Sequence, residues 1–228
     1  LFNNPSALDH ALKKGFYQTA AELPVICGQD AQGYYWRCLH EGVQDLAFKW
    51  HEHLLTPLLA EGWTICNPPL PKAIRDGFDI AGHSVPTVTP YALRGDLQGD
   101  LNSPDLACRV EDAPRPMLRQ REWIYALAEF CAEDDWNKLW HLPLALLADD
   151  RLHTFTVCGR VYWVGEDERI LLAPLPTRML DTELQKRLTL KKLESNVSDV
   201  AKLNLRGLIQ CITEILANEQ PIDRKKWL

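Results

Sequence analysis

A β-hairpin is expected near the start of the chain, where residues 25–39 have the sequence VICGQDAQGYYWRCL. The flanks 25–27 and 34–39 are rich in β-branched, aromatic and other apolar residues, which favour strands. The residues between them, from Gly28 to Gly33, are polar and glycine-rich, as turns are. The segment therefore predicts two antiparallel strands joined by a polar loop.

Helices are expected on both sides of this hairpin. The Asn4-Pro5-Ser6 triplet before it has the composition of a helix start. After it, apolar residues recur at steps of three and four, which indicates an amphipathic helix. That buried stripe comprises Val43, Leu46, Ala47, Trp50, Leu54 and Leu58. Pro57 is expected to bend or end the helix, because proline lacks the N–H that the helical ladder needs. Residues 1–66 are therefore predicted to form a helix, a hairpin and a second helix.

The middle of the chain is rich in residues that interrupt regular structure. Eight prolines and four glycines lie between Cys66 and Pro116. Segments of this length without periodicity are typical of functional loops and linkers. Residues 67–116 are therefore predicted to be an irregular connecting region that contains a domain boundary.

Residues 117–228 are predicted to be mainly helical with one β-hairpin. Apolar side chains share one helical face from Leu118 to Cys131, and Asp134 or Asp135 can cap a second helix. Two strands are expected at 154–164 and 170–173, and further helices at about 181–193 and 195–218. Two helices followed by a hairpin are compatible with a winged-helix-like segment at 118–174. The predicted fold class is α+β, mainly helical, with two β-hairpins.

Charge is distributed unevenly along the chain. The net charge is −6, but residues 183–228 carry nine basic and six acidic residues, which gives +3 there and −9 elsewhere. Basic residues on successive helical turns can follow a phosphate backbone, and an aromatic such as Trp227 can stack on a base. The predicted nucleic-acid-binding residues are Lys186, Arg187, Lys191, Lys192, Lys202, Arg206, Arg224, Lys225 and Lys226, with Arg115, Arg119 and Arg121 as a second group.

The cysteines predict a reducing compartment. There are seven, an odd number with wide spacings, which is unlike a disulfide framework. Cys27, Cys38 and His40 are close enough in sequence to be weighed as zinc ligands, but no Cys-x-x-Cys pair accompanies them. No metal and no cofactor is therefore predicted. A cytoplasmic location is expected, with no membrane association, since no apolar run reaches the length of a membrane span. The chain begins with Leu1, so we expect a fragment, a processed product, or numbering that starts after a removed segment.

Motifs for catalysis are absent at the spacings that chemistry needs. There is no Gly-x-Ser-x-Gly elbow and no phosphate-binding glycine loop. The triplet from His51 to His53 lacks the His-Glu-x-x-His spacing that places two imidazoles on one helical face. No catalytic residue is predicted. The enzymatic alternative is a hydrolase with a site in the 67–116 loops, which would use His83, Asp96 and Asp100.

The leading functional hypothesis is a non-catalytic subunit of a multi-protein, nucleic-acid-associated complex, such as those of mobile elements or bacterial antiviral defence. Its partners would be RNA or DNA, held through the C-terminal basic helices, and other protein subunits. Eight tryptophans are compatible with protein binding, because tryptophan is enriched at binding hot spots. A pure protein-interaction adaptor, cut from a longer protein, is the remaining alternative.

Overall fold

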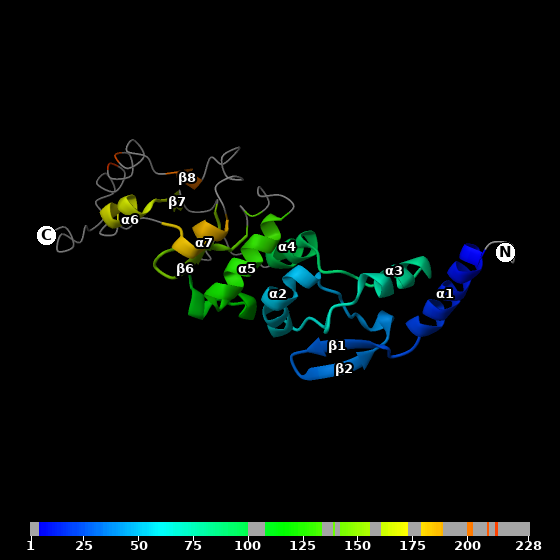
Figure 1. Ribbon diagram of the computed structural model, residues 1–228. Helices are drawn as coiled ribbons and strands as arrows, with labels where there is room; N and C mark the ends of the chain where they lie inside the picture. Colours follow the sequence, from blue (N-terminus) through cyan, green and yellow to red (C-terminus); the bar gives the residue numbers. More distant parts are fainter. Residues whose placement is uncertain are drawn as a thin grey trace. The chain divides into compact units, whose positions relative to one another are not determined.

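The computed structural model describes residues 5–99, 108–133, 139, 142–155, 161–172, 179–188, 200–202, 209 and 213 (Figure 1). Two compact units are present. Unit 1 comprises residues 1–89 and 115–117, and unit 2 comprises residues 90–114 and 118–228. The predicted α+β class is confirmed, because helices are combined with two small antiparallel sheets of three strands each. The predicted connecting region 67–116 is shared between the two units.

Unit 1 is built on a sheet of strand order β2-β1-β3, in which both pairings are antiparallel. Its elements in chain order are α1 (Pro5–Ala21), β1 (Ile26–Asp30), β2 (Gly33–Arg37), the 3-10 turn η1 (Leu39–Glu41), α2 (Phe48–Ala60), β3 (Ile65–Cys66) and α3 (Lys72–Ile80). The predicted hairpin is thus confirmed as β1 and β2.

The turn of this hairpin is shorter than the sequence predicts. Residues 28–30 belong to β1, so only Ala31 and Gln32 connect the strands. The Asp30 carboxylate fixes this turn, because its Oδ1 accepts the N–H groups of Gln32 at 2.8 Å and Gly33 at 3.2 Å. Gly33 has a φ of +144°, a backbone conformation that side chains disfavour.

The core of unit 1 lies between the sheet and helices α1 and α3. One cluster of buried residues comprises Ala20, Ala21, Ile26, Val43, Cys66, Phe78 and Val85, and Leu54 and Leu58 of α2 are also buried. Tyr17 of α1 packs edge-on against Phe78 of α3, with ring centroids 5.0 Å apart. A Cβ on Gly77 would collide with the Tyr17 ring, so the glycine permits the close approach of the two helices.

Helix α2 departs from its predicted bounds at both ends. It starts at Phe48, because the preceding residues are extended: Gln44 bridges Ile65, and Asp45 bridges Thr87. The Asp45 main chain bonds to Pro86 and Val88, so sheet-like pairing replaces the expected first helical turn. Of the two expected effects of Pro57, a bend or an end of the helix, the second does not occur, since α2 continues to Ala60 with Pro57 buried beside Leu58.

Two helices lie in the middle region that the sequence predicts to be irregular. These are α3 and α4 (Pro90–Gly99). Each begins at a proline, with Pro71 directly before α3 and Pro90 as the first residue of α4. Proline suits these positions because the first helical N–H groups have no partner within the helix. The prolines that indicate loops therefore mark helix starts here.

Unit 2 contains a second antiparallel sheet, of order β4-β6-β5, and a parallel pair, β7-β8. Its elements after α4 are β4 (Cys108–Arg109), the 3-10 turn η2 (Val110–Asp112), α5 (Arg121–Ala132), β5 (Ala145–Leu146), β6 (Arg151–His153), β7 (Val161–Trp163), α6 (Glu166–Leu172), α7 (Thr182–Arg187) and β8 (Val200–Lys202). A further 3-10 turn, η3 (Pro116–Leu118), lies where the chain leaves unit 1. Helix α5 is the buried centre, with Ile124, Leu127 and Cys131 fully enclosed.

The C-terminal hairpin is placed wrongly by the sequence. It is formed by β5 and β6 around a turn in which Asp150 has a φ of +67°. Residues 166–172 are helical instead of turn and strand, because three consecutive acids suit a helix N-terminus. No helix-helix-hairpin order occurs in the described part of 118–174, where 145–146 is a strand.

The predicted last helix is described only in part. Val200–Lys202 is a strand that pairs with β7, which contradicts a helix at those residues. The β-branched Val200 lies opposite Val161 in this pairing, and strand pairing outweighs the helical periodicity. Ile209 and Thr213 are helical, and residues 189–199 lie outside the described residues. Among the described residues, no helix has the length and apolar character to cross a membrane.

We predict opposite effects of alanine at two glycines of unit 1. Gly77→Ala should destabilise the unit by about 1–3 kcal/mol, because the added methyl overpacks the Tyr17 contact. Gly15→Ala, on α1 with open space around it, should stabilise by about 0.5–1 kcal/mol through helix propensity. Urea unfolding of both variants measures the difference, and equal effects would contradict the close packing of α1 and α3.

Candidate functional site

Three aromatic side chains in succession are exposed on strand β2. Tyr34 is 64% exposed, Tyr35 36% and Trp36 67%. We call these three residues the aromatic edge. Strand β2 is the outermost strand of the sheet, as Figure 1 shows, and among the described residues it pairs only with β1. An unprotected edge with large apolar side chains is unusual, because such edges promote association with other chains.

Tyr34 and Trp36 lie on the open face of the sheet. They are opposite Gln29 and Cys27, and alternation along a strand places these four side chains on one face. Asn67 follows β3 on the same side, where its amide Nδ2 donates to Gln29 Oε1 at 2.5 Å and to the Tyr34 hydroxyl at 3.2 Å. Two aromatic rings therefore lie beside a fixed pair of amides.

Tyr35 and Arg37 lie on the other face, toward the core. The Arg37 side chain lies along the strand, with its guanidinium 5.2 Å from the Tyr35 ring centroid and 3.8 Å from Asp30 Oδ2. A Cβ at Gly28 would be in ordinary van der Waals contact with Arg37 Cγ and in tighter contact, 3.1 Å, with Thr64 Cγ2, so this face is closely packed. This face is largely occupied, so the open face and the outer edge are the accessible parts of the hairpin.

Only some of the main-chain amide and carbonyl groups of β2 face β1. In an antiparallel pair, opposite residues alternate between hydrogen-bonded and non-hydrogen-bonded. A two-residue turn is closed by a hydrogen-bonded pair, here Asp30 and Gly33. The amide and carbonyl groups of Tyr35 and Arg37 therefore face β1, whereas those of Tyr34 and Trp36 point outward from the sheet.

Two of the predicted nucleic-acid-binding arginines of unit 2, Arg121 and Arg187, belong to a polar network centred on Asp181. This buried carboxylate caps α7 by accepting the N–H groups of Glu183 and Leu184 at 2.9 and 3.0 Å. It also accepts the Tyr125 hydroxyl at 2.8 Å and pairs with Arg121 at 3.2 Å. All the oxygens of Asp181 are thus engaged inside the unit.

Arg121 is held between two carboxylates. Its Nε donates to Asp150 Oδ1 at 2.7 Å while Nη1 contacts Asp181. The hydrogen bond to Asp150 raises the pKa of the Arg121 guanidinium above its ordinary value. Burial and the bond to Asp181 raise the pKa of Tyr125 to about 12. The tyrosine therefore remains a neutral donor under ordinary conditions.

Arg187 and Lys186, on α7, are also close to acids. The Arg187 guanidinium lies 3.0 Å from Glu122, 3.2 Å from Glu183 and 3.8 Å from Glu129. It stacks on the Tyr125 ring at 5.0 Å. Lys186 is exposed, and its amine lies 3.8 Å from Glu183. The positive charge of Arg187 is thus compensated inside the network.

Arg115 and Arg119 have structural contacts in separate units. In unit 1, Arg115 lies 3.1 Å from Glu61 at two of its nitrogens, and the other Glu61 oxygen accepts the Met117 N–H at 2.9 Å. In unit 2, Arg119 donates to the Ala113 carbonyl at 2.9 Å. Lys202 lies on β8. The remaining predicted residues, Lys191, Lys192, Arg206, Arg224, Lys225 and Lys226, lie outside the described residues.

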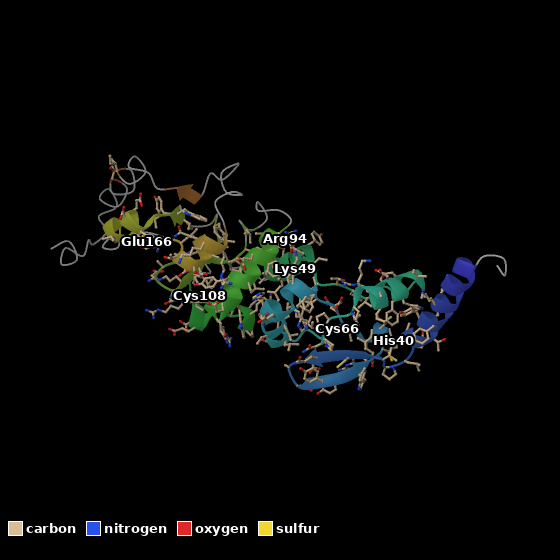
Figure 2. All side chains as sticks on the ribbon, in the orientation of Figure 1. His40, Lys49, Cys66, Arg94, Cys108 and Glu166 are labelled. Atoms are coloured by element: carbon tan, nitrogen blue, oxygen red, sulfur yellow. The ribbon has the colours of Figure 1, made fainter. Side chains whose placement is uncertain are left out.

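The cysteines and the histidine considered as zinc ligands do not converge in the described residues. No group of three or more His, Cys, Asp or Glu side chains there could hold an ion. Cys66 and His40 lie apart in unit 1, as Figure 2 shows, and Cys38 Sγ contacts the Glu22 carbonyl at 3.5 Å. Zinc binds thiolates, and burial raises the pKa of Cys66 to about 12, which disfavours that form.

The described residues of the hydrolase alternative belong to different units. His83 follows α3 in unit 1, and Asp96 lies on α4 in unit 2. Asp100 lies outside the described residues. The described residues bring none of these three together within one unit.

Sequence reasoning missed the aromatic edge, although a signal for it exists. Successive residues of a strand face opposite sides, so three consecutive aromatics cannot all face one core. At least one of Tyr34, Tyr35 and Trp36 must therefore lie on the outer face of a sheet this small. The sequence alone does not indicate that β2 is an edge strand, which depends on where β3 pairs.

We predict that Asp181 is the main stabilising group of unit 2. Asp181→Ala should cost about 2–4 kcal/mol, because it removes the α7 cap and leaves Arg121 and the Tyr125 hydroxyl without an acceptor. Asp181→Asn keeps a cap and should cost less. Asp149→Ala, at an exposed residue of the neighbouring turn, is the control and should stay within about 0.5 kcal/mol. Urea denaturation measures all three, and a near-neutral Asp181→Ala would contradict the network.

The chain was compared with models of protein families, with curated proteins and with solved structures, and none of the three comparisons found a match.

Proposed function

We propose that this chain is a non-catalytic, protein-binding subunit of a larger assembly, and that it binds partners through the aromatic edge. The observation that carries the proposal is the exposure of Tyr34, Tyr35 and Trp36 on a strand whose outer side pairs with no other strand in the described part of the chain. Single exposed apolar residues are ordinary on protein surfaces. Tyr34 and Trp36 together on one face of an edge strand, with Tyr35 between them on the other face, form a continuous exposed edge instead.

The chemistry of the patch favours a protein partner. Tyrosine and tryptophan dominate binding hot spots because they bury a large apolar area and also offer a polar group. The Gln29 and Asn67 amides beside them can bond to a partner's main chain or side chains. The described cations near the patch include Arg37, which already contacts Asp30. Such a surface is apolar and amide-rich, without an excess of positive charge to attract phosphates.

Substitution of the open face provides the test. Trp36→Ser combined with Tyr34→Ser should remove at least nine-tenths of the protein partners that the native chain retains from cell extract, because both hot-spot rings are lost. Phe48→Ser is the matched control, since Phe48 is 86% exposed in the same unit and lies outside the patch. The extract is treated with nuclease, and bound proteins are quantified by mass spectrometry. Retention of the same partners by the double variant would refute the proposal.

Nucleic-acid contact through the C-terminal cations is the second candidate. The excess of positive charge in residues 183–228, against a negative remainder, favours it. Most of the predicted cations whose side-chain contacts are described bind carboxylates or main-chain carbonyls of the chain itself. The proposal therefore rests on Lys191, Lys192, Arg206 and the basic cluster at 224–226. Polynucleotide binding would add to protein binding in the assembly, as in a nucleic-acid-associated complex of several subunits.

Salt dependence tests this second candidate. Binding of the chain to single- and double-stranded DNA and RNA should weaken steeply as salt rises, because displaced counterions drive the association. Replacing Arg224, Lys225 and Lys226 by Gln should lower the slope of log affinity against log salt by about 2–3. Lys72→Gln is the control, since Lys72 pairs with Asp76 on α3 of unit 1. Fluorescence anisotropy measures the slopes, and unchanged slopes would contradict the assignment.

A further inference from the structure

We propose that a second copy of this chain occupies the aromatic edge, with the β2 strands of the two copies pairing antiparallel to form one six-stranded sheet. The inference rests on the proposed function, because it identifies the partner of the same surface. It commits to the outer side of β2 and to a two-fold axis at Tyr35. Heterologous partners of the edge are the alternative outcome.

The free main-chain groups match those of a second copy. Tyr34 and Trp36 each present an amide and a carbonyl outward, one on either side of Tyr35. A two-fold axis at Tyr35 places Tyr34 opposite Trp36 of the second copy, and Trp36 opposite its Tyr34. Each of these two pairs can exchange two hydrogen bonds, so that every outward group of both residues gains a partner.

The number of paired residues favours the register with the two-fold axis at Tyr35. Strand β2 has five residues, from Gly33 to Arg37, and Tyr35 is the middle one. An axis at Tyr35 pairs all five residues, whereas an axis at Tyr34 or Trp36 leaves strand residues unpaired. The Tyr35 residues of the two copies would then form a non-hydrogen-bonded pair, in which side chains are closest.

The side chains are self-complementary in this register. On the open face, Tyr34 and Trp36 of one copy meet Trp36 and Tyr34 of the other, which gives two cross-strand aromatic pairs. Asn67 and Gln29 remain beside these rings as polar groups at the rim. Both copies therefore bury exposed aromatic surface without placing a charge on that face.

Charge is complementary at the ends of the paired strands. Arg37 of one copy lies opposite Gly33 of the other, and Gly33 itself pairs with Asp30. Glycine has no side chain, so the guanidinium can cross it toward the Asp30 carboxylate of the second copy. Within one copy the same ion pair is long, at 3.8 Å, and Arg37 Nε is buried without a hydrogen-bond partner. The pairing places no like charges opposite each other.

The area indicates a weak dimer. Fully burying an aromatic side chain removes about 150–250 Å² from water. At exposures of 64%, 36% and 67%, the aromatic edge offers roughly 250–420 Å² per copy. Both copies together bury less than the roughly 1,200 Å² of a standard stable interface. Self-association should therefore depend on concentration, with a dissociation constant in the range of tens to hundreds of micromolar, as roughly expected of small transient interfaces.

A charge-swap experiment at Tyr35 tests the pairing. Tyr35→Lys and Tyr35→Glu each place two like charges directly opposite across the two-fold axis, so each variant alone should associate at least tenfold more weakly than the native chain. An equimolar mixture of the two variants places Lys opposite Glu and should restore association. Sedimentation velocity of the full chain, from about 10 μM to about 1 mM, measures the populations. The same two substitutions at Tyr91, which is 75% exposed on α4, are the controls and should have no effect.

The outcomes are distinct. A native chain that stays monomeric up to about 1 mM overturns the proposal, and so does association that the mixture fails to restore. Far-UV circular dichroism checks that both variants fold. If either variant fails to fold, Tyr35→Cys replaces it, and oxidation should form a disulfide between position 35 of two copies, which peptide mapping distinguishes from disulfides of the seven native cysteines. A monomeric chain that still loses protein partners on the Tyr34 and Trp36 substitutions would refute self-pairing while leaving the proposed function intact.

Discussion

The alternation of side chains along a strand is the constraint on which the interaction surface depends. Strand β2 carries Tyr34, Tyr35 and Trp36 in succession, and its inner face carries Tyr35 and Arg37, the latter opposite the core residue Ile26 of β1. Because neighbours in a strand face opposite sides, Tyr34 and Trp36 must lie on the open face. Among the described residues, no strand pairs with the outer side of β2, so apolar rings and outward main-chain groups occur on the same element.

Carboxylates inside each unit determine what the nearby arginines do. Asp181 and Asp150 hold Arg121, three glutamates hold Arg187, and Glu61 holds Arg115. Removing one partner from such a pair is costly because the other charge stays partly desolvated. These arginines therefore stabilise the folded units in which they lie. Arginines, which suggest phosphate binding in a sequence, form ion pairs within each unit here.

Local chemistry explains which elements the sequence predicts well. The early hairpin and helices α2 and α5 follow from apolar periodicity, since their buried stripes face a single core. The misplaced elements depend on distant pairing instead. Residues 200–202 form a strand because their main chain pairs with β7, and residues 43–47 are extended because Asp45 bonds to the segment around Pro86 and Val88. Pro71 directly precedes one helix and Pro90 begins another, although the proline-rich composition predicts loops there.

The sequence by itself determined the mixed α+β class, the position of the first hairpin and the presence of three adjacent aromatics on it, because these depend on residues close together in the chain. Tertiary structure alone decided that β2 is an edge strand, since β3 and the chain around residue 44 take the other side of the sheet. It also decided that Arg121 and Arg187 meet acids from distant segments. Sequence distance carries no information on such contacts, because folding brings them together through the burial of other residues.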